Sequence, residues 1–196
     1  MGGVVVAIRV VAGGFHGPVR DMDLIQDKIA INGLKLSEAL IPMWVRLPRG
    51  SHAPVSRICR ILSEIQVNLA YMTTSGVGSP QPAVCCIDPE DHPKVEARLA
   101  QDAELRALVT FGDPVGLLSL FPHRANLKLL GVALAALNES GVTIHGLASS
   151  IAALTFIVDF DDLEKAATIL QHSMLLPQEH QPMRPEFKVR QEGISR

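Results

Sequence analysis

Two loops of the sequence carry the residue types best suited to binding a small charged molecule. Ser51 and His52 precede one predicted helix, and His123 and Asn126 precede another. The N–H groups of a first helical turn have no partner inside the helix, and the helix dipole is positive there, so these loops suit a carboxylate or a phosphate. Ordinary helix capping, with Ser51 or Asn126 as the acceptor, is the alternative for both loops.

Further polar residues stand at matching places in the two halves of the chain. Asn68 and Thr143 each open the strand that follows the first helix of their half, and hydroxyl residues close that strand. Such side chains can contact a ligand, or they can bond nearby backbone groups. Together with the first helical residues, the candidate ligand contacts are Ser51, His52, Val55, Asn68 and Thr74 in the first half, and His123, Asn126, Leu127, Thr143, Ser149 and Ser150 in the second.

The sequence lacks the residue combinations that usually carry catalysis or hold a metal ion. It contains no HExxH, no glycine-rich phosphate loop, no GxSxG and no pair of carboxylates at catalytic spacing. His145 has no Asp, Glu or Cys nearby at a metal-ligand spacing. The acidic cluster Asp159, Asp161 and Asp162 falls at a strand end and a helix start, where capping accounts for it. We therefore predict no catalytic residue, no metal and no cofactor.

Composition argues against several classes of protein. The net charge is −2 with both signs mixed along the chain, whereas nucleic-acid binding calls for clustered Lys and Arg. No uncharged apolar run approaches the ~20 residues of a membrane-spanning helix. We assign the positive mean hydropathy to buried strands and an oligomer interface. Cys59, Cys85 and Cys86 form no CxxC pair, and we expect them to be reduced in a cytoplasmic protein.

One pattern occurs twice, about 71–75 residues apart, and organises these candidates. Residues 62–69 recur as 137–144, and residues 91–94 recur as 162–165. Each copy gives an apolar helix face, a short turn, two strands, an acidic turn and a second helix. A repeat of this size predicts two copies of one small domain. An interface between two like domains is a common place for a small ligand.

Hydrophobic periodicity and turn residues predict the elements of each copy. The first copy reads as strand 39–47, helix 54–66, strands 67–74 and 83–87, helix 88–101 and strand 108–111. The second copy reads as strand 115–121, helix 126–140, strands 142–148 and 154–160, and helix 161–172, with no final strand.

Three features complete this prediction. Pro42 favours an edge position or a bulge for the first strand, because proline cannot donate to a sheet ladder. A short strand at 27–32, ended by the turn signal Asn32-Gly33, could supply the strand that the second copy lacks. Residues 4–11 could form a further strand, and residues 177–196 read as a tail.

The second copy resembles ACT domains. The segment 134–144, LAALNESGVTI, is similar to their helix-to-strand junction, and 153–159 followed by 161–166, DDLEKA, is similar to the C-terminal ACT domain of aspartokinases. The resemblance covers 115–172 well and 40–110 loosely. It implies an α+β fold of two tandem ferredoxin-like βαββαβ (ACT) units, with antiparallel sheets and helices on one face.

The resemblance also implies a function. It indicates the regulatory portion of an aspartokinase without the kinase domain, binding an amino acid at an interface between ACT units and forming a homodimer. The implied organisation is an extension at 1–38, ACT units at 39–112 and 113–176, and a tail at 177–196. Two alternatives remain. One is a dimerisation protein without ligand, favoured by the absence of the family's usual glycine before the first helix. The other is a regulatory subunit acting with a separate catalytic chain.

Overall fold

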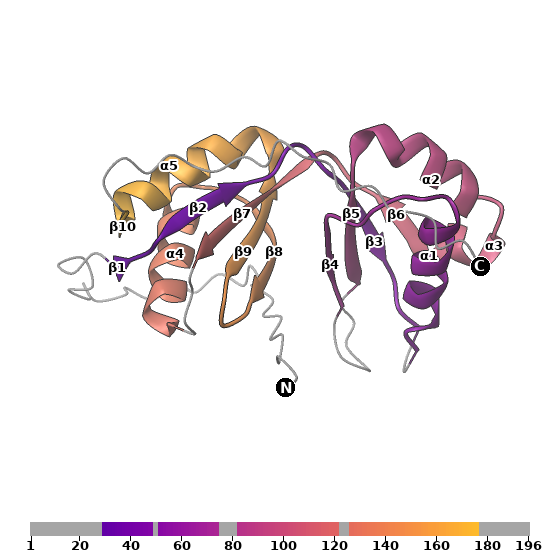
Figure 1. Ribbon diagram of the computed structural model, residues 1–196, viewed down its shortest axis with the longest axis horizontal. Helices are drawn as coiled ribbons and strands as arrows, with labels where there is room; N and C mark the ends of the chain where they lie inside the picture. The colour runs from indigo at the N-terminus through magenta and orange to yellow at the C-terminus, as the bar shows by residue number, and fades with distance from the viewer. Residues whose placement is uncertain (1–28, 49–50, 75–81, 122–125, 177–196) are drawn as a thin grey trace. The chain divides into compact units, whose positions relative to one another are not determined.

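The described residues fold as two compact units between which the chain alternates (Figure 1). The computed structural model describes residues 29–48, 51–74, 82–121 and 126–176. Residues 39–115 form one unit, called here the continuous unit. The described residues before and after it, 29–38 and 116–176, form the split unit. The expected strand at 4–11 and the expected tail at 177–196 lie outside the described residues.

The continuous unit is a four-stranded antiparallel sheet with helices on one face (Figure 1). Its strand order is β4-β5-β3-β6, which is the order of a ferredoxin-like βαββαβ unit. In chain order its elements are β3 (Ile41–Val45), α1 (Ala53–Glu64), β4 (Tyr71–Thr73), β5 (Ala83–Ile87), the 3₁₀ turn η1 (Pro89–Asp91), α2 (His92–Leu99), α3 (Ala103–Leu108) and β6 (Val109–Phe111).

The split unit repeats this architecture with one strand taken from ahead of the continuous unit. Its sheet order is β2-β7-β9-β8, so β2 holds the place that β6 holds in the continuous unit. Its elements are β2 (Gly33–Leu36), β7 (Val115–Phe121), α4 (Leu127–Glu139), β8 (Ile144–Ser149), β9 (Leu154–Asp159), the 3₁₀ turn η2 (Phe160–Asp162) and α5 (Leu163–Ser173), with a short parallel pair formed by β1 (Ile29–Ala30) and β10 (Met174–Leu175). Two ferredoxin-like units in tandem confirm the predicted fold class.

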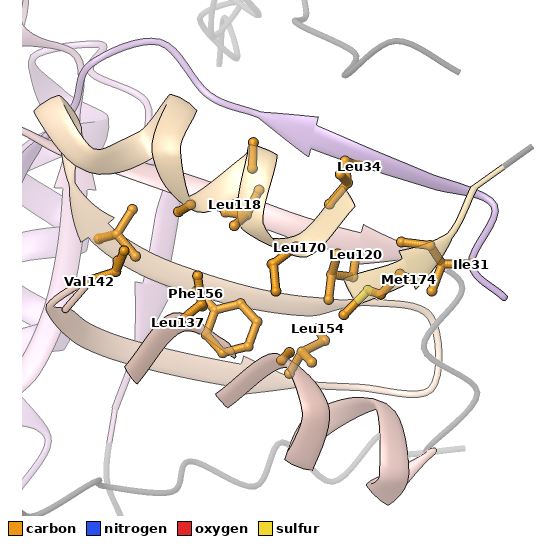
Figure 2. Close-up of a cluster of buried hydrophobic side chains, with 14 of the residues drawn as sticks. Ile31, Leu34, Leu118, Leu120, Leu137, Val142, Leu154, Phe156, Leu170 and Met174 are labelled. Atoms are coloured by element: carbon orange, nitrogen blue, oxygen red, sulfur yellow. The ribbon is translucent and has the colours of Figure 1, made fainter. Parts of the chain in front are cut away.

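Each unit has its own hydrophobic core between its sheet and its helices. In the continuous unit the core takes Ile58 and Leu62 from α1 and alternate residues of β5. In the split unit Phe156 of β9 is fully buried beneath α4 and α5, as Figure 2 shows. Its neighbours in that cluster include Leu34, Leu118, Leu120, Leu137, Leu170 and Met174. Among the described residues, no helix combines the length and apolarity needed to cross a membrane.

The helix α1 ends in a Schellman motif. The N–H of Gln66 bonds the carbonyl of Ser63 at 3.1 Å, and the N–H of Val67 bonds the carbonyl of Leu62 at 2.8 Å. These two bonds satisfy carbonyls that the last turn would otherwise leave without partners. Gln66 adopts a positive φ of 55°, a conformation that a side chain with a Cβ disfavours.

The helix α4 ends in the same motif. The N–H of Gly141 bonds the carbonyl of Asn138, and the N–H of Val142 bonds the carbonyl of Leu137, both at 3.0 Å. Gly141 has a φ of 70° and occupies the predicted position just beyond the helix end. The repeat of 62–69 in 137–144 therefore encodes one helix-ending motif in both units.

The strand predicted at 27–32 is wrong in its bounds. Residues 27–28 lie outside the described residues, and of 29–32 only Ile29–Ala30 is a strand, which pairs with β10. The fourth place in the split sheet belongs to β2, where Leu34 lies opposite Leu120 and Leu36 opposite Leu118. Asn32-Gly33 is not a hairpin turn but the junction between β1 and β2. The alternation of buried Leu34 and Leu36 with exposed Lys35 marks a half-buried strand.

The edge position predicted from Pro42 is also wrong. β3 lies between β5 and β6, so Pro42 is in an interior strand of the sheet. Its carbonyl accepts a hydrogen bond from Gly112 at 3.0 Å, just beyond the last residue of β6, Phe111. The N and O of one strand residue point toward the same neighbour. The missing N–H of Pro42 therefore faces the end of β6, where the ladder stops.

Candidate functional site

The start of α1 has no side-chain cap. His52 is its N-cap residue, and the His52 side chain makes no capping hydrogen bond. Ser51, a candidate cap from sequence, instead has its Oγ 3.2 Å from the N–H of Ala53, one residue before the capping position. Pro54 follows in the first turn and has no N–H. The backbone N–H of Val55 is therefore the first-turn donor left for an acceptor from outside the helix.

The structure brings two of the predicted contacts together at this helix start. The Nδ1 atom of His52 lies 3.4 Å from the Oγ1 atom of Thr74, which follows directly after β4. Both residues are exposed, so their side chains can reach a molecule in solvent. The side chain of Val55 packs in the core, which leaves only its backbone for a ligand. Asn68 is half-buried in the link between α1 and β4.

The start of α4 is satisfied by its own chain. The Oδ1 atom of Asn126 accepts hydrogen bonds from the N–H of Lys128 at 3.0 Å and from the N–H of Leu129 at 3.2 Å. Asn126 is therefore the helix cap, which was the alternative to ligand binding. Leu127 is exposed in the first turn, and His123 lies outside the described residues.

The hydroxyl candidates of the split unit lie at both ends of β8. Thr143 is exposed just before the strand, and Ser149 closes the strand opposite Leu154. The Oγ of Ser150 accepts from the N–H of Ala153 at 3.0 Å and donates to the carbonyl of Ala153 at 3.2 Å. Ser150 thus closes the turn between β8 and β9. This bonding to nearby backbone was the alternative to a ligand contact.

One polar pair escaped the sequence interpretation. The Nε2 atom of His145 lies 2.7 Å from Oδ1 of Asp159, across the β8–β9 pair. The ladder shifts register between Ile144 and Gly146, so His145 is the extra residue of a bulge. The two residues are 14 positions apart in sequence, so no local pattern reveals the pair. Aligning the two predicted strands as a hairpin could have revealed it. No group of three or more metal-ligating side chains occurs among the described residues.

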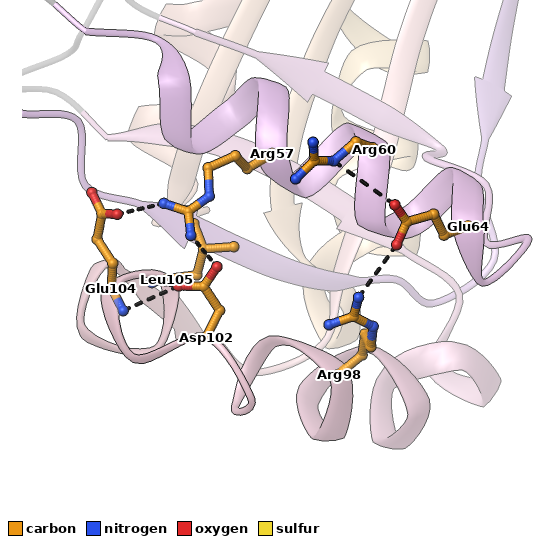
Figure 3. A network of polar contacts seen from close by, with 7 residues as sticks. All are labelled: Arg57, Arg60, Glu64, Arg98, Asp102, Glu104 and Leu105. Atoms are coloured by element: carbon orange, nitrogen blue, oxygen red, sulfur yellow. Dashed lines mark hydrogen bonds and ion pairs between the residues drawn. The ribbon is translucent and has the colours of Figure 1, made fainter.

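A network of charged side chains links α1 to α2 and to α3 with its cap residue (Figure 3). Arg57 pairs with Asp102 and Glu104, and Glu64 pairs with Arg98 at 3.3 Å. The side chain of Asp102 also caps α3, accepting from the N–H groups of Glu104 and Leu105 at 3.2 Å. This network holds the helix whose N-terminal end is open.

The same network shifts the pKa values of its members. The N–H of Leu105 and then the guanidinium of Arg57 hold the pKa of Asp102 below its ordinary value. The hydrogen bonds to Glu104 and Asp102 raise the pKa of Arg57. Both groups are therefore ionised at neutral pH, and the pair is a fixed feature of the α1 surface.

The cysteines of the continuous unit are all free thiols. Burial in the sheet raises the pKa of Cys85 and of Cys86 to about 12. A thiol attacks as its thiolate, so both side chains are poor nucleophiles at neutral pH. They serve as buried residues of the sheet, in agreement with the expectation that they are reduced.

No protein-family model and no curated protein matches the chain. Solved structures do match it. The regulatory subunit of aspartate kinase from Thermus flavus is 12% identical at a TM-score of 0.64, over 74% of this chain and 98% of that one. The ligand-free regulatory subunit from Thermus thermophilus is 14% identical at 0.62, over 74% and 100%. E. coli aspartokinase III in complex with lysine and aspartate is 16% identical at 0.56, over 76% and 34%.

These identities establish a likeness of fold. The chain matches the two regulatory subunits over nearly their whole length, but it matches about a third of the E. coli enzyme. The likeness agrees with the resemblance to the regulatory portion of aspartokinases that the sequence indicates. The chain therefore has the tandem ferredoxin-like fold of aspartokinase regulatory subunits.

Proposed function

We propose that this protein is a non-catalytic regulatory subunit that senses a small effector, an amino acid, and acts on a partner chain. The observation that carries this proposal is the match to solved regulatory subunits of aspartate kinase over 98% and 100% of their length. The absence of catalytic motifs from the sequence supports it. A cytoplasmic location is part of the same proposal.

The effector would bind at the open start of α1. Its carboxylate would accept a hydrogen bond from the N–H of Val55, where the helix dipole favours negative charge. The side chains of His52 and Thr74, 3.4 Å apart, would contact its polar groups. The continuous unit is preferred because Asn126 already fills the corresponding place at α4. In line with the resemblance, a second ACT unit would complete the site. Lysine is the first effector to test, since the E. coli structure contains it.

The regulatory mechanism would be thermodynamic linkage. A ligand that binds one arrangement of the protein more tightly than another stabilises that arrangement by its difference in binding free energy. A catalytic chain that prefers the same arrangement is then bound more tightly by the same coupling free energy, and one that prefers the other arrangement is bound more weakly. An aspartokinase-type catalytic chain is the partner that the structural likeness suggests.

Thermal melts of the full chain with each of the twenty amino acids test the sensor function. A ligand at ~100 Kd adds about 2.7 kcal/mol to the folded state and raises the melting temperature. We expect one amino acid, lysine first, to do so. A chain whose melting temperature responds to none of them is not an amino-acid sensor.

Variants then test the site. His52→Ala with Thr74→Val should abolish the shift caused by the effector. The matched control, Thr143→Val, changes an exposed residue in the split unit and should leave the shift intact. A shift that survives the double substitution but disappears in the control would place the site in the split unit.

The second candidate function is dimerisation without a ligand. It is favoured by Ala53 at the start of α1, where a glycine would let a carboxylate approach the backbone more closely. A stable dimer that no amino acid stabilises would support it. Copurification with a separately expressed aspartokinase catalytic chain would identify a regulatory subunit. It would distinguish that function from a sensor without a catalytic partner and from a dimerisation protein.

A further inference from the structure

Most of the large apolar side chains that the described residues expose belong to the split unit. There are four such side chains, and three of them, Leu127, Ile151 and Leu175, are in that unit. Leu127 and Ile151 are each 77% exposed, and Leu175 is 52% exposed. Single exposed apolar residues are common on protein surfaces, whereas a group of them at one place marks an interaction site.

The start of α4 and the β8–β9 turn lie at the same end of the split unit. Leu127 is the first residue of α4, which follows the end of β7, and Ile151 is in the turn between β8 and β9. The Oγ atom of Ser119, near the end of β7, lies 2.8 Å from the Oγ1 atom of Thr155, near the start of β9. The exposed Leu127 and Ile151 therefore extend from one end of the sheet.

The short strand β10 reaches this end as well. The N–H of Ile31 bonds the carbonyl of Leu175 at 3.0 Å, and the N–H of Asn32 bonds the carbonyl of Phe121 at 2.9 Å. Phe121 is the last residue of β7. Ile31 and Met174 mark this end of the unit in Figure 2. The surface formed there is called the apolar end and is defined by Leu127, Ile151 and Leu175.

Polar side chains beside the apolar end bond within the chain. Asn126 caps α4, and Ser150 bonds the backbone of Ala153. The hydroxyls of Ser119 and Thr155 bond each other. A small polar effector would have to replace these bonds, whereas an apolar surface of another protein would leave them in place.

The apolar end has a basic rim. No Asp or Glu occurs in the described segments that form it, which are 29–34, 119–121, 126–131, 147–156 and 172–176. Their single Lys or Arg is Lys128, which takes part in no ion pair among the described residues. A complementary surface therefore has apolar side chains and a carboxylate opposite Lys128.

We propose that the apolar end is the surface by which this protein binds its catalytic chain, and that the contact surface of that chain is apolar with an acidic residue opposite Lys128. This inference rests on the proposed function, which supplies the catalytic chain as the partner. Apolar side chains at the centre of a contact and a charge at its rim are the usual anatomy of a protein–protein interface.

The proposal gives the two units different ligands. The effector would bind beside His52 and Thr74 in the continuous unit, and the catalytic chain would bind the split unit. Allosteric coupling requires two distinct sites of this kind. A substitution at the apolar end should therefore weaken binding of the catalytic chain and leave the melting-temperature shift caused by the effector unchanged.

Calorimetric titration of the full chain with a separately expressed aspartokinase catalytic chain from the same organism tests the surface. Leu127→Asp and Ile151→Asp should each raise the dissociation constant at least tenfold, because each places a carboxylate in an apolar contact. Both replaced side chains are exposed, so the circular dichroism should stay that of the wild type. An acidic residue in the first turn suits the dipole of α4, so weaker binding by Leu127→Asp cannot reflect loss of the helix.

The matched control is Ala135→Asp. It adds the same charge to an exposed position of the same helix, about two turns from Leu127, and should leave the dissociation constant unchanged. Lys128→Glu should weaken binding several-fold, more strongly at low salt, because it places like charges opposite each other.

The outcomes separate this inference from the proposed function. A wild-type chain that does not bind the catalytic chain overturns both. Tight binding by the wild type and equally tight binding by Leu127→Asp and Ile151→Asp overturns the apolar end alone. If these two variants instead change the sedimentation equilibrium of the chain by itself, or its binding to phosphatidylserine vesicles, the surface serves a second copy or a lipid and the proposal is wrong.

Discussion

The first helices of the two units end alike and begin differently. Both α1 and α4 close with the same pair of backbone hydrogen bonds. At their starts, α4 is capped by Asn126, whereas α1 has no side-chain cap and is instead held from the side by Arg57. The architecture requires a fixed helix end, because the next strand leaves from it. The helix start is free to vary, and the two units differ there.

The helices also differ in what stabilises their outer surfaces. In the continuous unit, α1 forms ion pairs with α2, with α3 and with the cap residue of α3. In the split unit, α4 carries exposed leucine, glycine and alanine and two charges that oppose its dipole. Two copies of one fold therefore have different outer surfaces. The surface of α1 is covered by ion pairs within its unit, whereas the outward side of α4 carries small and apolar residues.

The largest expected difference between the units comes from their separate cores. Phe156→Ala removes a fully buried ring from the split unit and should lower its free energy of unfolding by about 3–5 kcal/mol. Trp44, the single tryptophan, lies in the continuous unit and reports its unfolding by fluorescence. Hydrogen exchange should show lost protection in β7 and β9, with little shift in the Trp44 transition.

The matched control reverses the experiment. Leu62→Ala empties a buried position of the continuous unit and should cost about 2–5 kcal/mol there. Its effect should appear in the Trp44 transition and leave the protection of β9 unchanged. Equal losses of protection in both units for either variant would show that the two cores unfold as one.

The shared helix ending predicts that substitution of its positive-φ residue changes the stability of the two units in opposite directions. Gly141→Ala forces a Cβ into a positive-φ conformation and should destabilise the split unit by about 1–2 kcal/mol. Gln66→Gly relieves the same strain in the continuous unit, so it should be neutral or stabilising by up to about 1 kcal/mol. Urea denaturation of both variants measures the difference. A destabilising Gln66→Gly would mean that the glutamine side chain contributes more than its backbone conformation costs.

A pH-dependent contribution should appear in the continuous unit. Because the pKa of Asp102 is lowered in the folded protein, its carboxylate stabilises that unit fully above the ordinary value of 3.8, and this contribution is lost as pH falls through the lower folded value. Asp102→Asn keeps a side-chain oxygen for the helix cap and removes the charge. It should be less stable than wild type near neutral pH, by urea denaturation followed with Trp44.

The stabilities of the wild type and the Asp102→Asn variant should converge as the pH falls below 3.8. Asp113→Asn provides the control, because Asp113 is exposed in the same unit and forms no ion pair among the described residues. A difference between Asp102→Asn and wild type that persists at low pH would mean that the amide disturbs the cap rather than the charge.

The parts of the fold that could be predicted from sequence are those fixed by local physics. Largely apolar runs between turn residues predicted β5 and β7 with their observed bounds. The cap at Asn126 and the left-handed residue Gly141 bounded α4 correctly. In each case the signal lies within a few residues of the element that it determines.

The missed parts depend on residues far away in sequence. The helix α3 has only one buried residue, Leu105, and its start depends on the capping side chain of Asp102, so it shows no periodic apolar face. The strand β2 is recognisable only once its partner β7 is known. At the candidate site, the contact between His52 and Thr74 joins two predicted residues, whereas the His145–Asp159 pair needed the register of the β8–β9 hairpin.

The smallest expected effect concerns the ion pairs of α1 and whether they contribute equally to the free energy of unfolding. Arg60 and Glu64 are 3.8 Å apart, and their side chains are 72% and 51% exposed. Exposed pairs of this kind contribute little, because water screens the charges and ordering two long side chains costs entropy. Arg60→Ala should therefore change the free energy of unfolding by less than about 0.5 kcal/mol. Arg57→Ala should cost more, because it removes a partially covered guanidinium shared by Asp102 and Glu104. If both variants lost equal stability in urea denaturation, the α1 surface would be stabilised by its overall charge rather than by the clamp at Arg57.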